Sequence, residues 1–201
     1  MGPGFWDERY AGEAFAYGTT PNDFLVDSVG YLPEGGRILL PGDGEGRNSV
    51  WLAEQGFYPT AVDFSVSGLE KARNLAATRG VTIDTVQADL TEWDWPTAAF
   101  DAVVAIFVHL PPAHRQRVHR AMLAALRPGG CLRLEAYTPA QLDYGTGGPP
   151  VEEMLYPREA LEADFHEARI LSLQETVRPV HEGRYHFGEG AVVQLVAERP
   201  A

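Results

Sequence analysis

Short apolar runs, many of them β-branched, alternate along this chain with stretches of helical periodicity. The runs that predict strands lie at residues 37–40, 59–63, 81–88, 100–108 and 130–137. The periodic stretches predict helices over residues 20–32, 48–55, 67–78 and 112–126. This alternation is typical of a doubly wound α/β fold, in which helices cover both faces of a parallel sheet and ligands bind beyond the carboxyl ends of the strands.

Capping residues indicate where these helices begin and end. Pro21 takes the favoured first position of the first helix. Ser67 and Glu70 have the spacing of a capping box, and Gly56 and Gly80 are placed to end two helices.

The pattern changes after residue 157. One helix is predicted over 157–163, followed by two longer strands, 168–177 and 191–198, whose link at 178–190 has no helical period. We expect these strands to form an antiparallel hairpin at one edge of the sheet. The Gly/Pro-rich stretch 144–150 has too little chain after it for a second domain, so we interpret 138–160 as an active-site loop region within a single domain, 1–201.

Composition excludes several classes of partner. With 16 basic and 28 acidic residues the net charge is −12, which repels nucleic acid and anionic lipid. The single cysteine, Cys131, allows no internal disulfide, and no apolar run approaches the ~18 residues of a membrane span. The start of the chain lacks a basic segment followed by an apolar one. We expect a cytoplasmic monomer or homodimer that acts on a small molecule.

The most informative segment follows the first predicted strand, where Gly42, Gly44 and Gly46 alternate with Asp43 and Glu45. Glycine tolerates positive φ and lets a ligand lie against the backbone beside a helix N-terminus. A pyrophosphate-binding fingerprint that begins at residue 42 needs a third glycine at residue 47, where this chain has arginine. Since the two acidic residues suit a cation, the turn favours a nucleoside-like cationic ligand over a dinucleotide.

Carboxylates also follow the next two predicted strands. Asp63 lies 21 positions after the first glycine, the spacing of an acceptor for both ribose hydroxyls. Asp89, at the following strand end, can accept a hydrogen bond from an exocyclic amine such as that of adenine. Three successive strand ends therefore converge on one nucleoside.

With these motifs the chain resembles the class I S-adenosylmethionine-dependent methyltransferases, through Gly42 to Gly46, Val62 to Ser65, Ala88 to Leu90, Phe100 to Val103 and Leu126 to Gly130. The resemblance implies a seven-stranded Rossmann-like methyltransferase sheet with a reversed last strand and S-adenosyl-L-methionine as cofactor. The chain departs from the family at Leu40, where an acid is usual, and Asp43 or Glu45 can substitute. The cofactor-binding residues that we expect are Tyr17, Thr20, Gly42, Asp43, Gly44, Glu45, Gly46, Arg47, Asn48, Asp63, Phe64, Ser65, Asp89, Leu90 and Ile106.

Within that family the chain is similar to the small bacterial subgroup related to tellurite-resistance and thiopurine methyltransferases. The residues that carry this are Gly46 to Asn48, Trp6 to Tyr10, Tyr17 to Pro21 and Tyr185 to Gly188. The resemblance implies that residues 1–20 form a lid over the cofactor, with Tyr17 and Thr20 as its contacts.

The candidate catalytic residues are His109, Arg184 and His186. His109 follows the fourth predicted strand, and the other two lie in the predicted terminal loop near the same edge. His114 and His119 fall on the exposed pattern of a helix and are expected to be solvated. No histidine pair has metal-ligand spacing with a nearby acid, so we expect no metal.

In-line methyl transfer to a soft sulfur, selenium or tellurium nucleophile needs little base assistance, whereas an oxygen or nitrogen nucleophile requires a base such as His109 or His186. A regulatory or scaffold protein that binds S-adenosylmethionine without turnover is the alternative.

Overall fold

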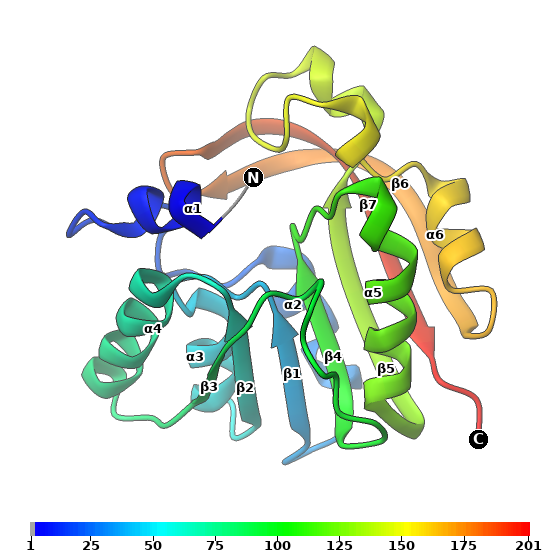
Figure 1. The fold of residues 1–201 in the computed structure, drawn as a ribbon, viewed down its shortest axis with the longest axis horizontal. Coiled ribbons are helices and arrows are strands. Elements are labelled where there is room, and N and C mark those ends of the chain that lie inside the picture. The colour runs from blue at the N-terminus through cyan, green and yellow to red at the C-terminus, as the bar shows by residue number, and fades with distance from the viewer. Residues whose placement is uncertain (1–2) are drawn as a thin grey trace.

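A computed structural model describes residues 3–201 and contains one sheet of seven strands with helices packed against it (Figure 1). The strand order is β3-β2-β1-β4-β5-β7-β6, and all neighbours are parallel except β7, which runs antiparallel to both β5 and β6. This confirms the predicted doubly wound sheet with an antiparallel C-terminal hairpin. The strands are β1 (Arg37–Pro41), β2 (Tyr58–Asp63), β3 (Asp84–Gln87), β4 (Phe100–Ile106), β5 (Leu126–Tyr137), β6 (Arg169–Glu182) and β7 (His186–Glu198). The α-helices are α1 (Pro3–Tyr10), α2 (Asp23–Ser28), α3 (Arg47–Glu54), α4 (Val66–Arg79), α5 (Pro112–Ala125) and α6 (Arg158–Asp164), and short 3₁₀ helices lie at Val29–Tyr31, Pro139–Asp143 and Glu152–Met154.

The central strand β1 is apolar on both faces, as a strand covered by helices on both sides must be. Leu39 packs in the core that contains α5 and α6, whereas its neighbours Ile38 and Leu40 pack in the core with Leu25 of α2 and Leu52 of α3. Alternation of side chains along the strand thus divides its residues between two cores.

The hairpin is much longer than predicted. The segment 178–190, expected to be a link, continues both strands, and the turn is confined to residues 183–185. Hydrophobic periodicity missed this because two residues that point inward there, Arg178 and Glu182, are charged. Arg178 pairs with Glu135 of β5 and Glu182 pairs with Arg47 of α3, so the strand buries ion pairs on either side of the apolar Val180.

Three helices differ from the sequence prediction, two in where they begin and one in being present at all. α2 begins at Asp23 with Asn22 as its cap, so Pro21 is not a helical residue. α4 is capped by Ser65, whose hydroxyl accepts from the amide of Gly68, so the Ser67–Glu70 capping box is wrong. The N-terminal segment, where no helix was predicted, contains the helix α1. Residues 1 and 2 of the predicted lid lie outside the described residues.

Candidate cofactor and acceptor site

The turn between β1 and α3 places three glycines in the left-handed region, with φ of 67°, 61° and 87° at Gly42, Gly44 and Gly46. Their roles differ. A Cβ at Gly44 would lie 2.7 Å from the hydroxyl of Tyr10, and one at Gly46 would lie 2.6 Å from the Cβ of Ala72. Those two glycines therefore admit α1 and α4 against the turn, and only Gly42 lines the cavity described below.

Asp63 closes this turn from the end of β2. One carboxylate oxygen accepts from the amide of Gly44 and the other from the amide of Ser65, each at 2.9 Å. Burial disfavours the charged form and raises the pKa of Asp63 to about 6. The carboxylate both fixes the turn and faces the cavity, as the spacing predicted.

Asp43 keeps one oxygen for a ligand. Its Oδ2 accepts from the hydroxyl of Ser49, while Oδ1 is buried and has no hydrogen-bond partner among residues 3–201. Burial raises its pKa to about 6. The neighbouring Arg47 has an unpartnered buried nitrogen, Nη1, within the same described part of the chain. Both residues line the cavity, so its wall contains a buried acceptor and a buried donor that have no partner in the described part of the chain.

Two other predicted contacts hold the N-terminal segment over the turn. Glu45 accepts from the amide of Ala16 and from the ammonium group of Lys71, each at 2.8 Å. Asn48 accepts from the amide of Asn22 at 3.0 Å. Since both oxygens of Glu45 are engaged, Asp43 is the better substitute for the acid that the family places at residue 40.

The remaining predicted contacts divide into two groups. Phe64, Asp89, Leu90 and Ile106 line the cavity with Tyr17. Asp89 is exposed and accepts from the amide and hydroxyl of Thr91. Ser65 serves as a helix cap, and Thr20 is exposed; neither is among the lining residues.

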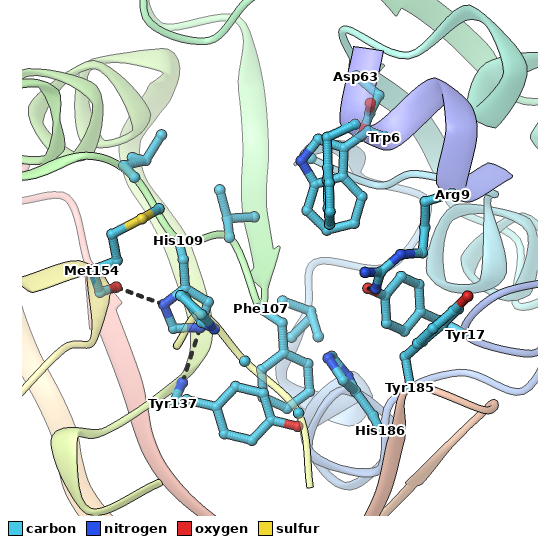
Figure 2. A pocket seen from close by; sticks show the side chains of 18 of the residues that line it. Trp6, Arg9, Tyr17, Asp63, Phe107, His109, Tyr137, Met154, Tyr185 and His186 are labelled. Atoms are coloured by element: carbon cyan, nitrogen blue, oxygen red, sulfur yellow. Dashed lines mark hydrogen bonds between the residues drawn. The ribbon is translucent and has the colours of Figure 1, made fainter. Parts of the chain in front are cut away.

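These side chains surround a cavity of about 840 Å³ at the carboxyl ends of the parallel strands, within the roughly 300–1,000 Å³ typical of small-molecule sites. The helix α1 and the loop that follows β5 lie over this edge of the sheet (Figure 1). One side of the cavity, which we call the glycine-turn side, is formed by Gly42, Asp43, Asp63 and Asp89. The other, which we call the aromatic side, contains Trp6, Arg9, Tyr17, Phe107, His109, Tyr137, Tyr185 and His186 (Figure 2).

The rings of the aromatic side form a continuous series. The ring centroids of Tyr17 and His186 lie 4.6 Å apart, those of His186 and Phe107 5.0 Å apart, and those of Phe107 and Tyr137 4.4 Å apart. Phe107 has a φ of 54°, a costly backbone conformation for a non-glycine residue and one that is often found at functional sites. The hydroxyl of Tyr137 is buried without a hydrogen-bond partner among residues 3–201.

His109 lines the cavity as expected, but both ring nitrogens are engaged by backbone. Nδ1 lies 2.9 Å from the carbonyl oxygen of Met154, and the amide of Tyr137 donates to Nε2 at 3.2 Å (Figure 2). Burial lowers its pKa to about 4. The ring is therefore neutral, and the lone pair that a base requires is occupied.

His186 lies at the start of β7 with its Nδ1 3.6 Å from Glu182. Burial lowers the pKa of His186, although the carboxylate opposes this. Glu182 is itself 2.5 Å from a guanidinium nitrogen of Arg47, accepts from Asn22 at 2.8 Å and lies 3.5 Å from Arg178. Despite burial, Arg47 holds the pKa of Glu182 down at about 2.

Two expectations about charged side chains are wrong. Arg184 lies in the hairpin turn, is exposed, rests on the ring of Tyr185 and is not among the lining residues. His119 is fully buried, with Nδ1 2.8 Å from Asp164, because it faces α6 rather than solvent. His114 is half-buried and lines the cavity.

Arg9 lines the cavity but was not among the predicted site residues, although its position in the sequence indicated it. Trp6, Arg9 and Tyr10 have the i, i+3, i+4 spacing that places side chains on one helix face. Read as a helix, that segment points an arginine and two aromatic rings in one direction.

Among residues 3–201, no group of His, Cys, Asp and Glu side chains is arranged to hold a metal ion, and no helix has the length and apolarity needed to cross a membrane.

Comparison with known proteins agrees with this geometry. Residues 38–130 match the model of a methyltransferase domain family. The thiocyanate methyltransferase 1 of Brassica oleracea is 32% identical over 130 residues, which cover 63% of this chain and 55% of that protein. Residues 38–130 thus contain a methyltransferase domain, and the strand order of the sheet agrees with the fold expected from the resemblance to the class I enzymes.

Two solved structures share the fold across nearly the whole chain. TehB from Haemophilus influenzae has a TM-score of 0.72 at 16% identity, covering 98% of this chain and 66% of TehB. The [4+2]-cyclase SpnF has a TM-score of 0.75 at 21% identity, covering 99% of this chain and 95% of SpnF.

Proposed function

We propose that this protein transfers a methyl group from S-adenosylmethionine to a small-molecule acceptor. The observation that carries the proposal is the division of one cavity into two sides of different chemistry. The glycine-turn side offers carboxylates and an unpartnered buried acceptor, and the aromatic side offers rings together with His109, whose two ring nitrogens are both engaged by backbone.

The residues present fit the cofactor. Asp63 is buried at the position where the ribose hydroxyls of a nucleoside need an acceptor. The unpartnered Oδ1 of Asp43 and Nη1 of Arg47 are an acceptor and a donor, as an amino acid with an ammonium and a carboxylate group requires. Burial without a protein partner is costly for such atoms, so a ligand that satisfies both is favoured.

When bound, S-adenosylmethionine supplies an electrophilic methyl group on a sulfonium. The chain's own contribution is to position the acceptor and exclude water. Residues 3–20 act as a lid, since α1 places Trp6 and the segment after it places Tyr17 in the cavity wall, and 138–160 acts as the opposite wall through Gly147 and Gly148. The π faces of the wall favour a cationic sulfonium.

The acceptor that this wall suits best is a soft nucleophile. His109 cannot accept a proton without losing its bond from the amide of Tyr137, so an acceptor that needs deprotonation must use His186 or His114 as a base. A sulfur, selenium or tellurium nucleophile that arrives unprotonated avoids this requirement. The relative that is named a thiocyanate methyltransferase supports the same direction.

A protein that binds the cofactor and performs no methyl transfer is the second candidate, favoured by one observation: the neighbour SpnF is named a cyclase although it shares the fold. One experiment separates the two. We expect S-adenosylhomocysteine to bind at micromolar affinity in calorimetry and NAD not to bind. In the presence of an acceptor panel of thiocyanate, hydrosulfide, small thiols, selenite and tellurite, we expect S-adenosylmethionine to be converted to S-adenosylhomocysteine, with a methylated product seen by mass spectrometry. Cofactor binding without product from any acceptor would favour the second candidate.

A further inference from the structure

Charge is distributed unevenly around the cavity. The four carboxylates that line it are Asp43, Glu45, Asp63 and Asp89, and all belong to the turns that follow β1, β2 and β3. The aromatic side, as defined above, has no lining carboxylate within residues 3–201, and its ionisable groups are Arg9, histidines and tyrosines, of which only Arg9 is permanently charged. A cationic ligand is therefore matched on one side, and the opposite side is matched to negative charge.

Arg9 is held in place by aromatic rings and not by an acid. Its guanidinium carbon lies 3.9 Å from the ring centroid of Tyr185 and 4.7 Å from that of Phe5. Its Nη1 donates to the hydroxyl of Tyr17 at 3.0 Å. Within the described part of the chain it has no carboxylate at ion-pair distance. The cation is thus positioned while its remaining donors are left for a ligand.

Arg47 lines the same cavity as Arg9 but, unlike Arg9, it has a carboxylate partner. A nitrogen of its guanidinium lies 2.5 Å from Glu182, so its charge is matched within the protein. Arg184 provides a second contrast, since its guanidinium carbon lies 4.8 Å from the ring centroid of Tyr185 but outside the cavity lining. Of these three arginines, Arg9 combines a place in the cavity wall with an unmatched charge.

We propose that Arg9 is the residue that recognises the acceptor, and that the acceptor is a small, singly charged and weakly hydrated anion, such as thiocyanate or a thiolate. This inference rests on the proposed methyl transfer and specifies its substrate class. A guanidinium is itself weakly hydrated and planar, so it pairs well with an anion of delocalised charge. The surrounding rings offer few hydrogen bonds, so a doubly charged, strongly hydrated oxyanion would lose more on leaving water than it regains.

The reaction balances with such an acceptor. A lone pair of the anion forms the new bond to the methyl carbon, the bond between that carbon and the sulfonium sulfur breaks, and its electron pair stays on sulfur. The negative charge of the acceptor and the positive charge of the sulfonium both disappear, so a neutral methylated product leaves beside a neutral thioether. No proton is released and no base is required.

Calorimetric titration of the protein saturated with S-adenosylhomocysteine tests the proposal, with thiocyanate as the probe. We expect thiocyanate to bind, and Arg9→Gln to weaken its binding at least tenfold while S-adenosylhomocysteine affinity stays within threefold. Arg9→Lys keeps the charge without the planar fork and should lie between the two. Arg184→Gln, which removes an arginine from the other contact of the same tyrosine, should leave thiocyanate affinity within twofold. Tellurite should bind more weakly than thiocyanate.

The possible failures are distinguishable. If S-adenosylhomocysteine does not bind the wild-type protein, the proposed function fails. If it binds, then any of three results overturns the role of Arg9: no thiocyanate binding to the wild-type complex, tighter binding of tellurite than of thiocyanate, or wild-type thiocyanate affinity in Arg9→Gln. Loss of S-adenosylhomocysteine affinity by more than tenfold in both Arg9 variants would also overturn it, because Arg9 would then serve the cofactor.

Discussion

The two sides of the cavity are built in different ways. The glycine-turn side comes from consecutive strand ends, and its carboxylates are held by the turns that follow β1, β2 and β3: Asp63 accepts from the amides of Gly44 and Ser65, Asp43 from the hydroxyl of Ser49, and Asp89 from the amide of Thr91. The aromatic side is assembled from α1, the end of β4, the loop after β5 and the terminal hairpin. One side depends on local turn geometry and the other on contacts between residues more than a hundred positions apart.

A buried ion-pair network ties these distant segments together. Glu182 of β6 contacts Arg47 of α3, and Glu135 of β5 contacts Arg178 of β6. The side-chain amide of Asn22 donates to both glutamates, at 2.8 and 2.6 Å. The network joins the helix of the glycine turn to the hairpin that carries His186, so the aromatic side depends on it more than the glycine-turn side does.

The largest expected effect is on stability, through Glu182→Gln. This change leaves the buried guanidinium of Arg47 without its counter-charge, and removal of one partner from a buried pair costs about 3–5 kcal/mol. Urea unfolding should show this loss. Glu162→Gln is the control, because Glu162 pairs with Arg158 at the surface, where about half of each side chain is exposed, and it should cost under about 0.5 kcal/mol. A loss below about 1 kcal/mol for Glu182→Gln would mean that the network does not hold the two sides together.

The next effect is on cofactor binding, through Asp63→Ala. We expect S-adenosylhomocysteine affinity to fall by about 2–4 kcal/mol, because two ribose hydroxyls lose a charged acceptor. We expect the fold to survive. Circular dichroism, which reports the sheet and helices, checks this. Calorimetry gives the affinity. Unchanged binding would show that Asp63 only shapes the turn through Gly44 and Ser65.

The contrast between the sides also explains what the sequence could predict. Gly42, Asp43, Asp63 and Asp89 follow apolar strands at regular spacing, and local pattern is enough to find them. The doubly wound sheet and the antiparallel hairpin followed from the same pattern, whereas the seven-stranded sheet with a reversed last strand was implied by the family resemblance. Glu45 was also predicted to bind the cofactor. It lines the cavity, but its two carboxylate oxygens accept hydrogen bonds from Ala16 and Lys71.

Most residues of the aromatic side could not be predicted from local sequence pattern. Which arginine reaches the cavity depends on how α1 packs over the sheet, so Arg184 was chosen and Arg9 missed. His119 was taken as solvated because its helix pattern does not reveal that Asp164 of α6 lies 2.8 Å away. Segment 178–190 was taken as a link because two of its inward-pointing residues, Arg178 and Glu182, are charged, and charge pairs between β5 and β6 have no hydrophobic period.

Gly147→Ala tests whether the loop after β5 closes the aromatic side. Gly147 has a φ of 148°, and a Cβ there would lie 2.5 Å from Cδ2 of His186 and 2.9 Å from the hydroxyl of Tyr137. The loop must move away, so we expect kcat/KM for the acceptor to fall about tenfold, or about 1.4 kcal/mol, with cofactor affinity within threefold. Gly145→Ala is the matched control, since Gly145 has a φ of 64° but nothing within 4 Å of its Cβ position. Equal losses in both variants would attribute the effect to backbone strain and not to contact with the cavity wall.

The smallest effect is a graded dependence of ligand affinity and stability on pH. It distinguishes the two sides because carboxyls titrate on the glycine-turn side and histidines on the aromatic side. Burial raises the pKa of both Asp43 and Asp63 to about 6, so in the ligand-free protein each carboxyl is protonated below that pH. A ligand that needs them ionised must displace those protons. Affinity for S-adenosylhomocysteine should therefore fall from pH 7 to pH 5, by at most about tenfold (about 1.4 kcal/mol) per pH unit for each carboxylate involved.

The contribution of these carboxyls to the free energy of unfolding changes with pH in the opposite direction to the affinity for S-adenosylhomocysteine. A carboxyl whose pKa is higher in the folded than in the unfolded state binds its proton more tightly when folded, so its contribution to the free energy of unfolding falls as pH rises from about 4 to 6. His109 and His186 on the aromatic side, and the buried His119, have lowered pKa values and act in the other direction. The carboxylate contribution is therefore read as the difference between the wild-type protein and Asp43→Asn. We expect the variant to gain stability relative to wild type as pH rises through this window and to show a shallower pH dependence of S-adenosylhomocysteine binding. Parallel curves for the two proteins in both measurements would show that Asp43 neither titrates in this range nor meets the ligand, and the acid that the family places at residue 40 would then have no substitute in this chain.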